Sequence, residues 1–199
     1  MDTLFDLEPE GEPENLPSIA GLRYIPDYID DKQHRWLLKT IDQGEWLTEL
    51  KRRVQHYGYR YGYGQQSSLI YLGDLPKWAA RFGAKLTRDK ITKEAPDQLI
   101  VNEYEPGQGI APHVDKEIFF ADTIVSLSLG SRCIMDLIHT QTRERVSILL
   151  APKSLLIFEG EARHDWKHGI SPRKTDIYHG SKIKRERRVS LTFRNVKNQ

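Results

Sequence analysis

The half of the chain after residue 96 is a series of short β-rich runs with no helix between them. The runs are DQLIVNEYE (97–105), DTIVSLSLG (122–130), RCIMDLIH (132–139), RVSILLA (145–151), SLLIFEG (154–160) and RRVSLTFRNV (187–196). Gly, Pro and charged residues separate them, as in sheets joined by tight turns. Parallel strands need crossover connections, which this half lacks, so a flavodoxin-like α/β fold is disfavoured. The pattern predicts about seven or eight strands in a β-sandwich or jelly roll.

The first half predicts an extended segment and two helices, which makes the chain α+β. LRYIPDYI (22–29) is typical of a strand. The next segment begins with Asp30 and Asp31 as candidate N-caps and ends at Gly44, as expected of a helix. In residues 75–89, apolar side chains recur at i, i+4 and i+8, which predicts a second, amphipathic helix after Asp74.

Length and composition favour a single domain over residues 18–199. The chain has 199 residues, 38% of them hydrophobic, and no apolar run near the ~20 residues of a membrane span. Cys133 is the only cysteine, which excludes an internal disulfide and fits a reducing compartment. The N-terminus lacks the pattern of a signal peptide, so we expect a cytoplasmic protein.

Charge is unevenly distributed. Residues 1–16 contain six acidic residues and no Lys or Arg, whereas the remaining chain has 30 basic and 22 acidic residues, a net charge of +8. The acidic, proline-containing stretch 1–17 predicts a disordered tail. The basic body favours a polyanionic partner such as nucleic acid.

The sequence IAPHVD (110–115) contains a candidate metal-binding pair. On a strand, His113 and Asp115 would point to the same face and could hold one ion together. About one His-x-acid pair is expected by chance in this composition, so the pair needs a third ligand. His168 in DWKHGISP is the candidate, with His164 as a competitor. Two His and one carboxylate would form the facial triad that binds Fe(II). Taken alone, each histidine is more often an ordinary polar residue than a metal ligand.

Two β-rich runs present polar side chains on one face. In RRVSLTFRNV, Arg188, Ser190, Thr192 and Arg194 alternate with apolar residues, and the two arginines could clamp a dicarboxylate. Asn102 and Tyr104 likewise share a face. The alternatives are an edge strand with solvated arginines and a polar pair without a ligand.

Together these motifs resemble the AlkB family of Fe(II)- and 2-oxoglutarate-dependent dioxygenases. The resemblance covers residues 18–196 and is strongest in LIVNEYEPGQGIAPHVDKE, WKHGI and RRVSLTFRN. It implies a double-stranded β-helix, or jelly roll, with N-terminal helices and a nucleotide-recognition lid at about residues 46–70.

The resemblance also implies roles for individual residues. His113, Asp115 and His168 would bind iron. Arg194 would bind the 2-oxoglutarate carboxylate next to the keto group, near Asn102, and the distal carboxylate would be held by Arg188 and Tyr104. Ser190 stands where the bacterial prototype has an asparagine that touches the cosubstrate.

The implied reaction uses Fe(II), 2-oxoglutarate and O2. We expect oxidative demethylation of N-alkylated bases, 1-methyladenine or 3-methylcytosine in DNA or RNA, with release of formaldehyde, succinate and CO2 as in alkylation repair. The alternatives are hydroxylation of a modified wobble uridine in tRNA and a non-catalytic jelly-roll binding module. By analogy, we expect a monomer with no membrane association.

The segment LKRRVQHYGYRYGYGQQ (50–66) is the candidate substrate-binding region. As one strand it would present Tyr57, Tyr59, Tyr61 and Tyr63 on a single face, close to Lys51, Arg52, Arg53 and Arg60. Aromatic and basic side chains together suit base stacking and phosphate contact. The alternative is that the tyrosines pack as ordinary core residues.

Three further details concern the substrate. Arg52 occupies the position of an aromatic residue that stacks on the damaged base in the bacterial prototype, and RRVQHYGY is more similar to the branch that modifies tRNA. Glu117 matches an acidic position that contacts the alkylated base in some members, or it is a solvated loop acid. In KIKRERR (182–188), we expect a solvated or phosphate-contacting turn with only Arg188 turned inward.

Overall fold

A computed structural model describes residues 17–48, 51–61 and 68–197. The predicted acidic tail therefore falls almost wholly outside the described residues. The first part contains β1 (Leu22–Ile25), α1 (Asp31–Asp42), β2 (Val54–Tyr57), β3 (Tyr59–Tyr61), β4 (Leu69–Tyr71) and α2 (Lys77–Arg88). The second contains β5 (Gln98–Tyr104), β6 (Ile110–His113), β7 (Ile124–Gly130), β8 (Cys133–His139), β9 (Arg145–Leu150), β10 (Leu155–Phe158), α3 (Gly160–His164), β11 (Trp166–Ile170), β12 (Thr175–Tyr178), β13 (Ser181–Lys184) and β14 (Arg188–Arg194).

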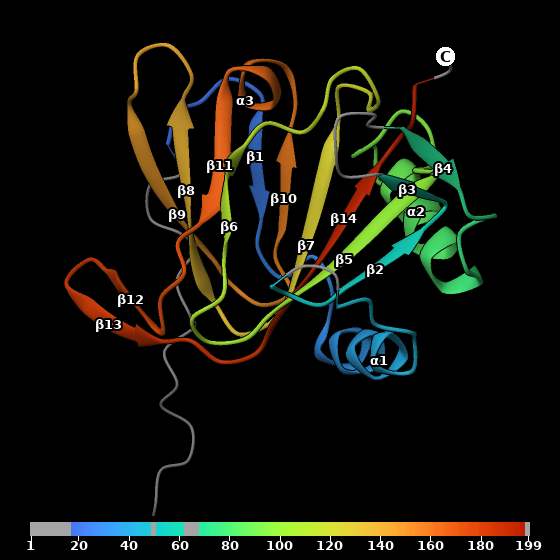
Figure 1. Ribbon diagram of the computed structural model, residues 1–199, viewed down its shortest axis with the longest axis horizontal. Coiled ribbons are helices and arrows are strands. Elements are labelled where there is room, and N and C mark those ends of the chain that lie inside the picture. The colour runs from blue at the N-terminus through green and yellow to red at the C-terminus, as the bar shows by residue number, and fades with distance from the viewer. Residues whose placement is uncertain (1–16, 49–50, 62–67, 198–199) are drawn as a thin grey trace, which may run out of the picture.

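Two antiparallel sheets form the body of the protein (Figure 1). The larger has the strand order β1-β10-β7-β14-β5-β2, and the smaller has the order β6-β11-β8-β9. Except for the consecutive strands β8 and β9, neighbours in these orders are distant in sequence, as the jelly-roll prediction requires. The α+β class and the double-stranded β-helix are confirmed.

Side-chain alternation gives the larger sheet two different faces. Val189, Leu191 and Phe193 of β14 join the core cluster that includes apolar residues of α1 and α2. Arg188 and Arg194, on the opposite face, line a cavity on the other side of the sheet. The two faces of β14 are thus as predicted, but β14 lies between β7 and β5 and is not an edge strand. Its arginines are therefore held inside the fold.

The two predicted helices form, and their ends differ in how they are capped. Asp30 caps α1 through a capping box with Gln33, as its sequence indicates. Helix α2 begins after Pro76, which makes no side-chain capping bond, so Asp74 is not its cap. Asp74 instead accepts a hydrogen bond from Tyr71 Oη at 2.6 Å.

Several elements differ from the prediction. The expected four-tyrosine strand is broken at Gly58, which has φ +75° and lies against the backbone of Asp97, where an added Cβ would be 1.8 Å from the carbonyl oxygen. The short helix α3 and the β12–β13 hairpin were not predicted, and the hairpin includes part of KIKRERR. In Figure 1 this hairpin projects away from α1 and α2.

The prediction that Arg188 is the only inward-facing arginine of KIKRERR is wrong. Arg185 is also buried and forms a two-point ion pair with Asp176, with both N···O distances at 2.6 Å. This pair anchors the hairpin to the body, because Asp176 also accepts a hydrogen bond from the Ile134 amide at 3.0 Å.

No helix among the described residues is both long and apolar enough to span a membrane.

Phe193→Ala should destabilise the fold strongly. Phe193 is fully buried, and its ring stacks on Phe82 of α2 with 5.2 Å between centroids. Removing a buried aromatic side chain typically costs about 3–5 kcal/mol. Urea denaturation of the metal-free protein should show this loss, and a loss below about 1 kcal/mol would mean that the sheet and α2 are not packed as described.

Candidate active site

The pairing of β6 with β11 brings two distant histidines together. His113 and His168 are direct partners across the antiparallel pair, and their ring centroids are 4.4 Å apart. Gly169 lies within β11. A Cβ at this position would lie 2.8 Å from Pro112 N, so glycine lets the two strands approach closely.

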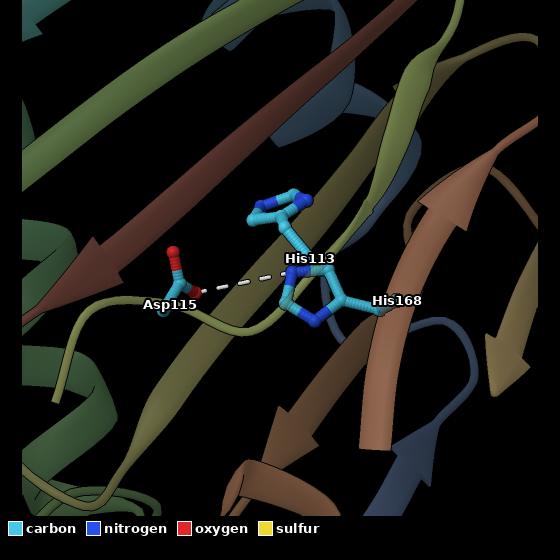
Figure 2. A group of neighbouring side chains, drawn as sticks. All are labelled: His113, Asp115 and His168. Carbon is cyan, nitrogen blue, oxygen red and sulfur yellow. Dashed lines mark ion pairs between the residues drawn. The ribbon is translucent and has the colours of Figure 1, made fainter. Parts of the chain in front are cut away.

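Asp115 completes a three-residue group. β6 ends at His113, so Asp115 reaches the histidines from the following loop and not from the strand that was predicted. Figure 2 shows its carboxylate facing the two imidazoles, with 3.9 Å between Oδ2 and His168 Nε2. One ligand atom from each residue lies within 4.8 Å of the others. Two imidazoles and one carboxylate are the donor set of the Fe(II) facial triad.

Hydrogen bonds prepare these side chains to bind a cation. His113 Nδ1 donates to the Ala111 carbonyl at 2.9 Å, which leaves Nε2 as the acceptor. Asp115 Oδ1 accepts from Arg194 Nη2 at 2.8 Å. Asp115 Oδ2 is buried and has no hydrogen-bond partner within the described part of the chain. A buried carboxylate oxygen without a donor is what a metal ion would satisfy.

The surroundings also set the protonation states. Burial, and next the neighbouring His113, lower the pKa of His168 to about 3, so the imidazole is neutral and able to coordinate a metal. Burial raises the pKa of Asp115, but the coulombic effect of its neighbours, with Arg194 the largest, outweighs burial and lowers the pKa to about 2. At neutral pH, His168 is therefore neutral and Asp115 is ionised, which are the forms that bind a metal.

The metal-free protein should lose stability as pH falls, in two steps. Unfolded His168 takes up a proton near pH 6.5, whereas the folded protein resists until about pH 3, so the contribution of neutral His168 disappears between these values. The contribution of Asp115 is present above about pH 3.8 and disappears as pH falls through about 2. Chemical denaturation at a series of pH values measures both steps. In His168→Asn the first step should be smaller, and an unchanged step would assign it to another group.

His164, the competing candidate, does not join the group. It lies on α3 between two carboxylates, with Nδ1 3.0 Å from Glu117 and Nε2 2.7 Å from Asp122. The neighbouring Arg163 is buried and donates to the Asp115 carbonyl at 2.7 Å. Helix α3 thus fixes the loop that carries Asp115, and Glu117 is turned toward His164 and does not line the cavity.

The triad opens into a cavity of about 550 Å³ between the two sheets. Its cationic lining residues are Lys51, Arg52, Lys116, Arg188 and Arg194, and Asp115 is its only carboxylate among the described residues. The cavity therefore carries an excess of four positive charges, which favours anionic ligands.

Arg188 marks a second anion-binding position in this cavity. It is 2% exposed, and Nη2 donates to Ser128 Oγ at 3.0 Å. Its Nε and Nη1 are buried and have no partner among the described residues. Arg188 and Arg194 are six residues apart on the same face of β14, about 20 Å between Cα atoms, and their long side chains reach into one cavity. A dicarboxylate with one carboxylate at each arginine would give both of its charged groups a cationic partner.

The other predicted cosubstrate residues line the same cavity. Asn102 and Ser190 are direct partners across β5 and β14, and Tyr104 is paired with Arg188. The ring centroid of Tyr104 is 5.6 Å from the Arg188 guanidinium carbon. Arg194 lies opposite Gln98, four residues from Asn102 along β5, and both Arg194 and Asn102 line the cavity.

The structure brings only part of the predicted substrate region to the cavity. Arg52 lines it. Tyr57 packs edge-on against Trp78 of α2 at 5.9 Å, on the side of the sheet away from the cavity. Tyr59 packs against Tyr71 at 5.1 Å and does not line the cavity. Tyr63 and the side chain of Tyr61 lie outside the described residues.

Three residues that support the site by contacts with distant parts of the chain were not predicted from the sequence. Arg163 supports Asp115, Ser128 binds Arg188, and Gln98 Oε1 accepts from Arg194 at 3.4 Å. Ser128 and Gln98 each sit on the polar face of a strand, which was a usable signal. Nothing in the local pattern around Arg163 indicated its role.

Comparisons with known proteins agree with this geometry. Residues 46–194 match the 2OG-Fe(II) oxygenase superfamily. The chain is 41% identical to uncharacterized protein L905 of Acanthamoeba polyphaga mimivirus, over 90% of this chain and 86% of the other. It is 34% identical to alpha-ketoglutarate-dependent dioxygenase alkB homolog 7, mitochondrial, of Mus musculus, over 86% of this chain and 76% of the other.

A longer relative is the Xenopus tropicalis tRNA (carboxymethyluridine(34)-5-O)-methyltransferase alkbh8. It is 37% identical over 91% of this chain, which spans only 32% of that protein.

Among solved structures, OsALKBH1 superposes with a TM-score of 0.66 at 16% identity, covering 88% of this chain and 96% of that one, and so shares the fold. The family match, the similarity to AlkB homologues and the His-Asp-His group agree. The chain belongs to the AlkB family of Fe(II)- and 2-oxoglutarate-dependent dioxygenases.

Proposed function

We propose that this dioxygenase hydroxylates a C–H bond in a modified base of a nucleic acid. The observation that carries the proposal is the cavity, which combines the triad with an excess of positive charge. A positive cavity favours polyanionic substrates such as DNA and RNA. A base must leave its stack to enter it, so a single-stranded or flipped nucleotide fits best.

Different residues of the cavity would bind the metal and the cosubstrate. His113, Asp115 and His168 would hold iron, and Arg194 keeps the Asp115 carboxylate oriented through its 2.8 Å bond. Arg188, Tyr104 and Ser190 would hold the distal carboxylate of 2-oxoglutarate, with Asn102 beside them. When bound, iron and 2-oxoglutarate activate O2 for oxidation of a substrate C–H bond, with succinate and CO2 as coproducts. The part of the protein is to bind and orient the reacting groups and to exclude competing reactions.

Two classes of base are candidates. Hydroxylation of an N-methyl group on 1-methyladenine or 3-methylcytosine would release formaldehyde and restore the base. Hydroxylation of a modified wobble uridine in tRNA would leave the added oxygen in place. The similarity to a relative named for carboxymethyluridine(34) of tRNA supports the second class.

Mass spectrometry of the products separates these candidates. The purified chain is incubated with Fe(II), 2-oxoglutarate and, in parallel, methylated DNA, methylated RNA, modified tRNA and a peptide. We expect succinate formation that depends on nucleic acid, together with a gain of one oxygen atom or loss of a methyl group. Turnover on the peptide alone would contradict the proposal. Absence of succinate with every substrate, and no effect of His113→Ala, would favour a non-catalytic binding module.

A further inference from the structure

Arg52 is a cavity cation to which the proposed iron and cosubstrate sites give no role. It precedes β2 and lies on a backbone fixed from both sides. The Glu103 amide donates to the Arg53 carbonyl at 3.0 Å, and Gln108 Nε2 donates to the Lys51 carbonyl at 2.7 Å. Arg53 is further held by the buried Glu103 carboxylate through its Nη2 at 2.8 Å. Arg52 thus has a defined direction, into the cavity.

The guanidinium of Arg52 is oriented but not neutralised. Its Nε donates to Asn102 Oδ1 at 2.9 Å, and its central carbon is 5.8 Å from the ring centroid of Tyr104. Nη1 and Nη2 have no hydrogen-bond or ion-pair partner within the part of the chain that the structure describes. Such a pre-oriented fork is the arrangement that binds a carboxylate at two points.

The other cavity arginines already have anionic partners or a place for one. Arg194 is paired with Asp115, and the buried Arg188 offers two unpartnered N–H groups to the distal carboxylate of the cosubstrate. Iron(II) and a dicarboxylate carry opposite charges that cancel, so the cavity keeps its excess of four positive charges when both are bound. Arg52 is less buried than Arg188, and its free fork is thus available to the substrate.

This charge also disfavours one class of base. Methylation at N1 of adenine or N3 of cytosine gives a base that is positively charged at neutral pH. Glu117, the acidic residue expected to meet such a base, is held by His164 outside the cavity. No second carboxylate among the described lining residues would offset a cationic base beside Arg52.

We propose that Arg52 determines substrate specificity, its fork binding a carboxylate carried by the base while its charge excludes cationic N-methylated bases. This deepens the proposed function, on which it rests, and identifies an acidic substituent on the base as the recognised group.

Binding of short single-stranded RNAs tests the proposal without turnover. Three otherwise identical oligonucleotides carry 5-carboxymethyluridine, its methyl ester or 1-methyladenine. Their Kd values are measured by fluorescence anisotropy with wild-type protein, Arg52→Met and Arg52→Lys. Arg81→Met is the matched control, because it removes the same charge from the exposed surface of α2, on the outer side of the larger sheet.

We expect wild-type protein to prefer the acid. Since a hydrogen bond to a charged group typically contributes about one to two orders of magnitude in affinity, Arg52→Met should weaken binding of the acid about 30-fold and of the ester about threefold or less. Arg52→Lys should restore part of the affinity, because it keeps the charge but not the fork. Arg81→Met should leave the preference for the acid unchanged.

Two outcomes would overturn the proposal. In the first, Arg52→Met weakens all three oligonucleotides equally or none of them. In the second, it leaves them unchanged and raises only the 2-oxoglutarate concentration for half-maximal succinate formation, which would assign the fork to the cosubstrate. If the wild type forms no succinate with any nucleic acid but shows the expected Kd pattern, the proposed function fails and the carboxylate-binding role of Arg52 stands.

Discussion

Replacing His168 with alanine should abolish iron binding and, with it, succinate formation. His168 is the only member of the triad supplied by β11, and it pairs directly with His113 of β6. Its depressed pKa keeps the imidazole neutral, so no proton competes with the metal at neutral pH. Even changes to residues that only support metal ligands cost about 10–100-fold in affinity or activity, so loss of a ligand should cost more than 100-fold. Fe(II) titration and succinate formation measure both effects.

The control for this variant is a histidine on the projecting hairpin. His179 is exposed and has φ +46°, a conformation that asparagine tolerates, so His179→Asn removes an imidazole with little strain. It should retain full iron binding and activity. If His168→Ala also retained iron, the ligand assignment would be wrong, and His164→Ala would then show whether the imidazole on α3 replaces it.

Arg188→Met should weaken cosubstrate binding without lowering the stability of the protein. The buried guanidinium has two N–H groups without partners in the described chain, so removing it relieves a desolvation cost in the ligand-free protein. We expect a free energy of unfolding that is unchanged or about 1 kcal/mol higher. The 2-oxoglutarate concentration for half-maximal turnover should rise about 100-fold or more, because the distal carboxylate loses a buried charged partner.

The neighbouring Arg187 provides a control, because its replacement should lower stability without affecting cosubstrate binding. It pairs with Asp42 of α1 and with the buried Glu103, on the side away from the cavity. Arg53 remains beside Glu103, so Arg187→Met should lower stability by only about 1 kcal/mol. It should leave the requirement for 2-oxoglutarate unchanged. Urea denaturation and succinate assays on both variants test the crossed pattern, and a loss of stability in Arg188→Met with normal cosubstrate use would contradict it.

Features with a clear local period were predictable from the sequence. The spacing of Trp78, Phe82 and Leu86 predicted α2, and the capping pattern at Asp30 predicted the start of α1. The alternation in β14 separated its arginines from its core residues, because side chains on a strand point alternately to its two faces.

Predictions failed where a distant contact overrides a local pattern. The alternating tyrosines suggested one strand, but Gly58 sits against Asp97 and turns the chain between β2 and β3. The charged stretch 182–188 suggested a solvated turn, but Asp176 draws Arg185 inward and stabilises a hairpin. In both cases the deciding partner lies outside the local pattern that was interpreted.

The sequence by itself determined which residue types were available for the site and which strand faces would carry them. It could not determine which histidine completes the triad, because His164 and His168 are both polar and only four residues apart. The tertiary structure decided this by pairing β11 with β6, which places His168 opposite His113 and leaves His164 on α3 with Glu117 and Asp122. The physical reason is that strand register between segments 55 residues apart depends on packing of the whole jelly roll, whereas side-chain alternation depends only on the local backbone.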